Sequence, residues 1–106
     1  LDFKINFEAR NEVVELIKTE KLKPEQTNRS LIALPEEYKV LSRGGGEIVI
    51  KSFTDHDIYI FFTYRGVLDN YSGFVYDSYE KAQEELSRQF VEVEKLSDSW
   101  YFCASR

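Results

Sequence analysis

The one histidine of the chain, His56, lies between two acids, Asp55 and Asp57. Imidazole and carboxylate groups ligate metal ions and transfer protons, so this triplet has the residue types of a metal site or a general base. However, the side chains of three consecutive residues in a tight turn diverge, and no second histidine or cysteine pair stands at ligand spacing. We therefore interpret residues 54–57 as a solvated hairpin turn and predict no metal ligand, cofactor or catalytic residue there.

Three consecutive glycines, residues 44–46, follow Arg43. Such a run allows backbone N–H groups to converge on an anion. Phosphate-binding loops, however, follow a strand and open a helix. Here a predicted short helix precedes the glycines and a predicted strand follows them. This order favours a flexible connector at which the chain reverses.

The segment of residues 65–73 is unusual because it combines charged, amide and aromatic side chains with two glycines. One interpretation is a β-hairpin that turns at residues 69–70, with its arginine paired to an acid. The other is a recognition loop held by rigid strands, a common position for binding sites. Aromatic and arginine side chains concentrate at interface hot spots. The predicted binding residues are therefore Arg65, Asp69, Asn70 and Tyr71.

Residues that perform covalent or acid–base catalysis are scarce in this chain. Cys103, the single cysteine, is surrounded in sequence by aromatic and small residues, which favours a buried apolar position over a reactive thiol. We predict a non-catalytic binding domain. The enzyme alternative would use His56 with Asp55, Asp57 or Asp69.

The composition is that of one globular domain: 106 residues, 42% hydrophobic and 31% charged. The net charge of −5 argues against a general nucleic-acid-binding protein, because phosphate neutralisation needs a basic surface. The longest apolar run, residues 58–62, is much shorter than a membrane span. Acids at Glu80, Glu84 and Glu85 are typical of a solvated helix face, but they would also suit a basic partner.

Hydrophobic spacing predicts helices at three places. Residues 11–22 have apolar positions on one helical face, with Asn11 as the cap. A short helix follows Pro35. A third helix, over residues 79–88, would begin with a capping box formed by Asp77 and Glu80. Residues 1–8 alternate in polarity, which predicts a short strand or an extended juxtamembrane stalk.

The strands are predicted at residues 47–53, 58–65 and 71–76, followed by a last hairpin over residues 90–104 that turns at residues 97–99. In the middle strand both faces carry bulky side chains, so we expect it to be central and covered on both sides, or covered on one side and exposed to a partner on the other. The whole predicts a single α+β domain: a mostly antiparallel sheet of four to six strands, with one or two helices packed on one side.

The run Leu34-Pro35-Glu36-Glu37-Tyr38-Lys39, followed by a glycine cluster, resembles the opening of the SMI1/KNR4 superfamily. Arg43 stands where that family usually has Asn before its glycines. The resemblance implies a cytoplasmic immunity-type protein that neutralises a toxin, and the acidic helix would be the surface that binds it.

Residues 41–50, 61–76 and 92–101 also resemble small uncharacterised domains that follow an N-terminal anchor in Gram-positive bacteria. A chain that begins at Leu1 and contains no methionine fits the removal of such an anchor. This resemblance implies an extracytoplasmic domain of a membrane-anchored or secreted protein, with a protein or a cell-envelope component as its partner.

Overall fold

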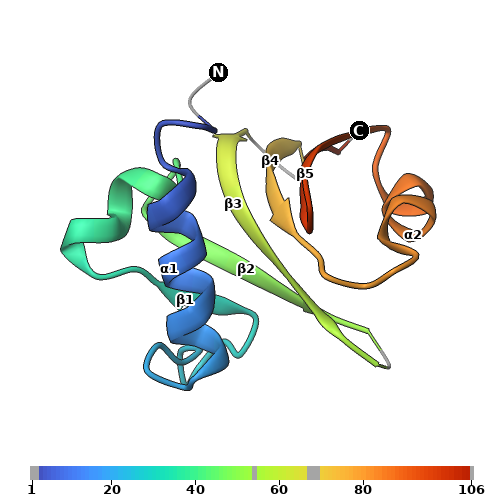
Figure 1. The fold of residues 1–106 in the computed structure, drawn as a ribbon. Coiled ribbons are helices and arrows are strands. Elements are labelled where there is room, and N and C mark those ends of the chain that lie inside the picture. The colour runs from blue at the N-terminus through green and yellow to red at the C-terminus, as the bar shows by residue number, and fades with distance from the viewer. Residues whose placement is uncertain (1–2, 54, 67–69, 106) are drawn as a thin grey trace.

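The computed structural model describes residues 3–53, 55–66 and 70–105. Its centre is one six-stranded antiparallel sheet with the strand order β1-β2-β3-β4-β6-β5 (Figure 1). The α+β prediction is therefore confirmed. The last hairpin inserts its second strand beside β4, which leaves β5 at the edge of the sheet. The strands are β1 Leu31–Ala33, β2 Glu47–Ser52, β3 Asp57–Arg65, β4 Tyr71–Tyr76, β5 Glu92–Ser97 and β6 Trp100–Ala104.

The two α-helices, α1 (Phe7–Lys18) and α2 (Ala82–Gln89), cover opposite faces of the sheet (Figure 1). Strand β3 shows why: Tyr59 and Phe61 join the core under α1, whereas alternate residues such as Ile60 join a second core under α2. Side chains of successive strand residues point to opposite faces, so a strand with bulk at every position needs two covers. The prediction of helices on one side is wrong. Of the two arrangements expected for the middle strand, the structure shows the central strand covered on both faces.

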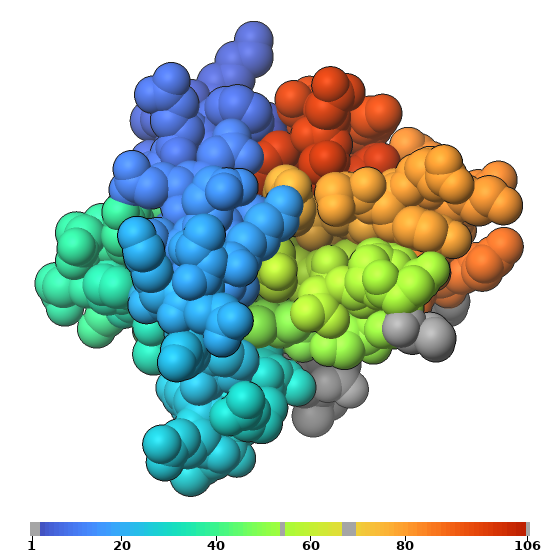
Figure 2. All heavy atoms as spheres, turned by 60° about the horizontal axis from the view of Figure 1, so that its bottom comes forward, coloured from blue at the N-terminus to red at the C-terminus, as the bar shows by residue number. Residues whose placement is uncertain are grey.

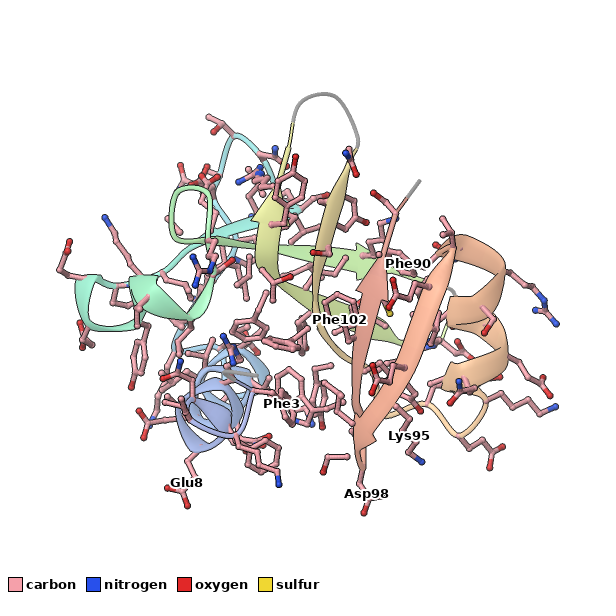
Figure 3. The ribbon with its side chains drawn as sticks, turned by 90° about the horizontal axis from the view of Figure 1, so that it is seen from above. Phe3, Glu8, Phe90, Lys95, Asp98 and Phe102 are labelled. Atoms are coloured by element: carbon pink, nitrogen blue, oxygen red, sulfur yellow. The ribbon has the colours of Figure 1, made fainter. Side chains whose placement is uncertain are left out.

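The described part of the N-terminal segment is neither a strand nor an extended stalk, so that prediction is wrong. Residues 3–6 form a turn, and α1 begins at Phe7. Phe3 and Phe7 are four residues apart, and their rings meet at a centroid distance of 5.2 Å. Phe3 also packs on Phe74 and Trp100, at 5.1 and 5.8 Å. Burial of these rings outweighs the period-2 polarity pattern. Figure 3 shows Phe3 beside α1 and Phe90 beside α2, on opposite sides of the sheet.

Neither predicted helix cap forms. Asn11 lies inside α1, where its Nδ2 donates to the Phe7 carbonyl at 3.2 Å. Helix α2 begins later than predicted, at Ala82, without a side-chain cap. Asp77 instead accepts a hydrogen bond from the Tyr79 N–H, at 3.0 Å, and so closes a local turn before the helix.

The connector before β2 follows the short helix η1 (Glu36–Leu41). Gly44, Gly45 and Gly46 all have positive φ angles, which reverse the chain as predicted. The Ser42 hydroxyl holds this reversal to the sheet, because it donates to the Glu47 carbonyl at 2.6 Å and accepts from the Phe62 N–H at 2.9 Å.

Candidate functional site

Arg65 lies at the end of β3 and is paired to an acid, as the hairpin interpretation predicted. Its Nη1 donates to the Gly44 carbonyl at 3.1 Å and lies 3.2 Å from Glu47 Oε1. The guanidinium group also lies over the Phe62 ring, 4.5 Å from its centroid. Arg65 thus joins the glycine turn to the sheet, and much of its charge is already balanced within the domain.

Tyr71 begins β4 and is partly buried. Its ring packs edge-on against Phe62 and Phe90, at centroid distances of 5.4 and 6.1 Å. Asn70 is exposed, and its carbonyl accepts the Gly66 N–H at 2.8 Å. Asp69, the fourth predicted binding residue, is outside the described residues. The structure therefore brings Arg65 and Tyr71 to the same aromatic ring, that of Phe62.

A pocket of about 340 Å³, which we call the Tyr71 pocket, opens beside this cluster. Three aromatic rings and one valine give it apolar walls, and one lysine supplies a cation. The Lys51 ammonium group lies 5.7 Å from the Phe90 ring centroid. The lining residues come from β2, β3, the start of β4, the end of α2 and the C-terminal segment: Val49, Lys51, Phe62, Tyr71, Gln89, Phe90 and Ser105.

A wider pocket of about 750 Å³ lies on the α1 face. Figure 2 shows α1 and the segment that follows it beside the β2–β3 hairpin, where this pocket is formed. Its lining mixes cations with acids, including Lys18, Arg29 and Asp57. The Lys18 ammonium group donates to the Tyr76 hydroxyl at 2.8 Å, a bond that raises the lysine pKa above its usual value. The mixed charge favours no single class of ligand.

His56 is the centre of a third site, which we call the His56 cluster. Its Nδ1 lies 2.8 Å from Asp55 Oδ1, and its Nε2 lies 3.0 Å from Glu85 Oε1 and 3.6 Å from Asp77 Oδ1. The imidazole is stacked between two aromatic rings, those of Phe53 and Tyr79, at centroid distances of 5.0 and 4.5 Å. Only 13% of the histidine side chain is exposed, so the predicted solvated turn is wrong for this residue.

The carboxylates of the cluster differ in environment. Burial raises the pKa of Asp77, whose side chain is fully enclosed, and its hydrogen bond from the Tyr79 N–H only partly opposes this. The hydrogen bond with His56 lowers the pKa of the exposed Asp55. For His56, burial opposes protonation, but the bond to Asp55 and the charges of Asp77 and Glu85 outweigh it and raise the pKa.

Asp77 and Glu85 were not predicted to be near His56. Asp77 was assigned to a cap, and Glu85 to a solvated acidic face. Asp57, which the enzyme alternative included, is exposed and lines the wide pocket instead. A usable signal was present in the β3–β4 hairpin, where Tyr59 pairs with Tyr76. If that register is continued beyond the strands, His56 falls opposite Tyr79, next to Asp77.

The acidic surface of α2 is smaller than the sequence suggested. Glu80 and Glu84 are exposed, but Glu85 turns toward His56 and its side chain is 25% exposed. Two carboxylates of the predicted set therefore remain free to face a basic partner, and the third belongs to the His56 cluster.

No family model, curated protein or solved structure matches this chain. The two resemblances seen in the sequence therefore remain untested. Among the helices in the described part of the chain, none is both long enough and apolar enough to cross a membrane.

Proposed function

We propose that the chain is a non-catalytic binding domain that takes an apolar side chain of a partner protein into the Tyr71 pocket. The observation that carries this proposal is the convergence of Phe62, Tyr71 and Phe90 around one open pocket. Aromatic side chains that line a pocket are typical anchors of protein interfaces. The rings come from separate elements of the sheet and helix, which fixes their positions before binding.

The size and charge of the pocket narrow the class of ligand. At about 340 Å³ it is at the lower end of small-molecule sites, a size that suits one large side chain better than a nucleotide or a cofactor. Lys51 at its wall favours a carboxylate next to the apolar group. We expect a partner that offers an aromatic or large aliphatic residue beside aspartate or glutamate.

The non-catalytic part of the proposal is supported by the state of the reactive groups. Burial raises the pKa of the Cys103 thiol to about 12, so this sulfur is protonated and enclosed at neutral pH. His56 is enclosed between two rings, and its nitrogens face carboxylates. Neither residue lines the Tyr71 pocket.

Selection from a displayed random-peptide library tests this proposal. We expect enriched peptides with an apolar residue next to an acid, whose binding is lost in Tyr71→Ala and weakened in Lys51→Glu but retained in Tyr64→Ala. Tyr64 is the matched control, since 54% of it is exposed and it does not line the pocket. Because Lys51→Glu reverses the charge at the pocket wall and leaves the three aromatic rings in place, it tests the site even if Tyr71→Ala perturbs folding.

The alternative of an immunity-type protein gives the opposite result in the same experiment. Capture of a basic partner by the acidic helix would enrich lysine- and arginine-rich peptides, fall steeply with ionic strength and be lost in Glu84→Lys. Binding in the Tyr71 pocket would respond weakly to salt. The proposed function would be overturned if the enriched peptides are basic, if their binding falls with salt, and if Tyr71→Ala leaves that binding unchanged.

We also propose an extracytoplasmic location. The support is the resemblance of residues 41–50, 61–76 and 92–101 to domains that follow a membrane anchor. Fractionation of cells that carry the complete gene tests the location. Recovery of the protein from the cytoplasm alone would contradict it.

A further inference from the structure

The His56 cluster contains three buried polar atoms without a hydrogen-bond partner within residues 3–53, 55–66 and 70–105: His56 Nε2, Asp77 Oδ2 and Glu85 Oε1. Asp77 is 1% exposed, and one ligand atom from each residue lies within 4.8 Å of the others. Buried polar atoms are nearly always satisfied, so this group of atoms requires an explanation.

A proton on His56 Nε2 does not satisfy them. Glu85 Oε1 is 3.0 Å from this nitrogen, yet the two atoms do not have hydrogen-bond geometry. An N–H bond reaches only about 1 Å along the axis of the nitrogen lone pair, and its acceptor must lie close to that axis. A metal ion is bound about 2 Å out along the same axis, and its other ligands lie to the side of it. The placement of Oε1 fits the second arrangement.

We infer that His56, Asp77 and Glu85 form a binding site for a divalent first-row transition metal ion of the Zn²⁺ type. One imidazole nitrogen and two carboxylate oxygens are a borderline donor set. Imidazole favours zinc and its neighbours, whereas all-oxygen sites suit magnesium and calcium. Glu85 Oε1 lies 3.0 Å and Asp77 Oδ1 lies 3.6 Å from His56 Nε2, so small side-chain adjustments would bring the nitrogen and one oxygen of each carboxylate to zinc-ligand distances.

The surroundings of His56 match those of a metal-bound histidine. Such a residue usually donates its other ring N–H to a carboxylate, which fixes the tautomer. Here Nδ1 faces Asp55 Oδ1 at 2.8 Å, so Nε2 is the nitrogen left to bind the metal. The rings of Phe53 and Tyr79 hold the imidazole plane on both sides.

Electrostatics and access also suit a divalent cation. Three carboxylates surround one imidazole, so the protonated, singly charged ring leaves two negative charges unbalanced, whereas a divalent ion beside the neutral ring leaves one. Tyr79 and Glu85 also line a surface pocket of about 210 Å³, together with Lys81, Glu84 and Arg88. The cluster therefore adjoins the surface at Tyr79 and Glu85.

Titration of chelator-treated protein with Zn²⁺, and separately with Co²⁺, tests the site. We expect one ion per chain, a visible Co²⁺ absorption band, and movement of the ring-proton NMR signals of His56. Because the chain has one histidine, these signals need no assignment. Mg²⁺ should leave them unchanged.

Near-isosteric variants identify the ligands. We expect Asp77→Asn and Glu85→Gln each to weaken Zn²⁺ binding by at least about 100-fold. Asp55→Asn removes the carboxylate that orients the ring and should weaken binding by about 10- to 100-fold. Glu84→Gln is the matched control: it removes the same charge from the exposed neighbour of Glu85 and should not change the affinity.

Two results would overturn the inference. One is a wild-type protein whose His56 signals do not move in excess Zn²⁺ at neutral pH, a measurement that needs no variant to fold. The other is a loss of affinity in Glu84→Gln as large as in Glu85→Gln, which would mean that zinc binds loosely to the acidic helix surface.

Discussion

The guanidinium group of Arg10 donates two hydrogen bonds to the main-chain carbonyl of Leu41. Arg10 Nε and Nη2 lie 3.2 and 3.1 Å from this oxygen. Arg10 is 1% exposed, and its guanidinium lies over the Phe74 ring, 4.6 Å from the centroid. The last carbonyl of η1 would otherwise lack a helical partner, so this buried cation ties α1 to η1 and to the sheet.

Replacement of Arg10 by alanine should therefore destabilise the domain strongly. The change removes two charge-assisted hydrogen bonds, leaves the buried Leu41 carbonyl without these two donors and opens a cavity above the Phe74 ring. We expect a loss of about 3 kcal/mol in the free energy of unfolding, measured by urea denaturation. Arg43→Ala is the matched control, because Arg43 is exposed and should change stability by no more than about 0.5 kcal/mol. Equal effects of the two substitutions would contradict this role of Arg10.

Gly73 should tolerate no side chain. It lies in β4 between Phe62 on one neighbouring strand and Cys103 on the other. A Cβ atom there would lie 2.6 Å from the Phe61 carbonyl oxygen, which is main chain and cannot move aside. We expect Gly73→Ala to cost about 3 kcal/mol or more of stability. In the control Gly66→Ala, the new atom meets the end of the exposed Tyr64 side chain, so thermal unfolding of that variant should change little.

The elements were largely predictable because their signals are local. The three strands of the central meander follow from alternating bulk between turn residues, and the structure places β2, β3 and β4 within about one residue of the predicted limits. The side of the sheet that each helix covers was not predictable in this way. It depends on which alternate residues of β3 each helix meets, and this is settled by tertiary packing.

The His56 cluster was also not predictable from local sequence signals. His56 and Asp77 are 21 positions apart in the chain, and Asp77 and Glu85 are 8 apart. The local sequence around each residue already explains it, as part of a turn, as a helix cap or as part of a solvated helix face. Asp77 forms a turn with Tyr79 before α2 begins at Ala82, and Glu85 in the first turn of this helix lies against the histidine. The hairpin register, extended beyond its strands, connects His56 with Asp77, whereas the position of Glu85 depends on how α2 packs.

Asn11 should contribute to stability through Trp100 rather than through a helix cap. The indole N–H donates to Asn11 Oδ1 at 3.0 Å, and Trp100 is 1% exposed. Asn11→Ala leaves this donor buried without an acceptor, which should cost about 1–2 kcal/mol. Asn11→Asp keeps an acceptor oxygen and should cost less. The fluorescence of Trp100, the only tryptophan, reports unfolding directly. A loss in Asn11→Asp as large as in Asn11→Ala would show that the Nδ2 bond to the Phe7 carbonyl, which both variants lack, matters more.

The stability of the domain should fall as the pH rises above about 9. Burial, together with the charge of Asp77, raises the pKa of the Cys103 thiol from 9.0 to about 12. Burial also raises the pKa of Tyr59 and of Tyr101 above 10.0. In each case the folded state holds its proton to a higher pH than the unfolded state does.

The sign of the effect follows from this difference in proton binding. Below pH 9 both states hold the thiol proton, and the stability is at its full value. Between pH 9 and about 12 the unfolded chain loses the proton first, so unfolding becomes more favourable by up to about 1.4 kcal/mol per pH unit for this one group. Urea denaturation at pH 8, 9.5 and 10.5 measures the slope. In Cys103→Ala the thiol no longer titrates, so its stability should fall less steeply with pH, even if the smaller side chain lowers stability at every pH. A variant slope equal to that of the wild type would show that the tyrosines alone cause the alkaline loss.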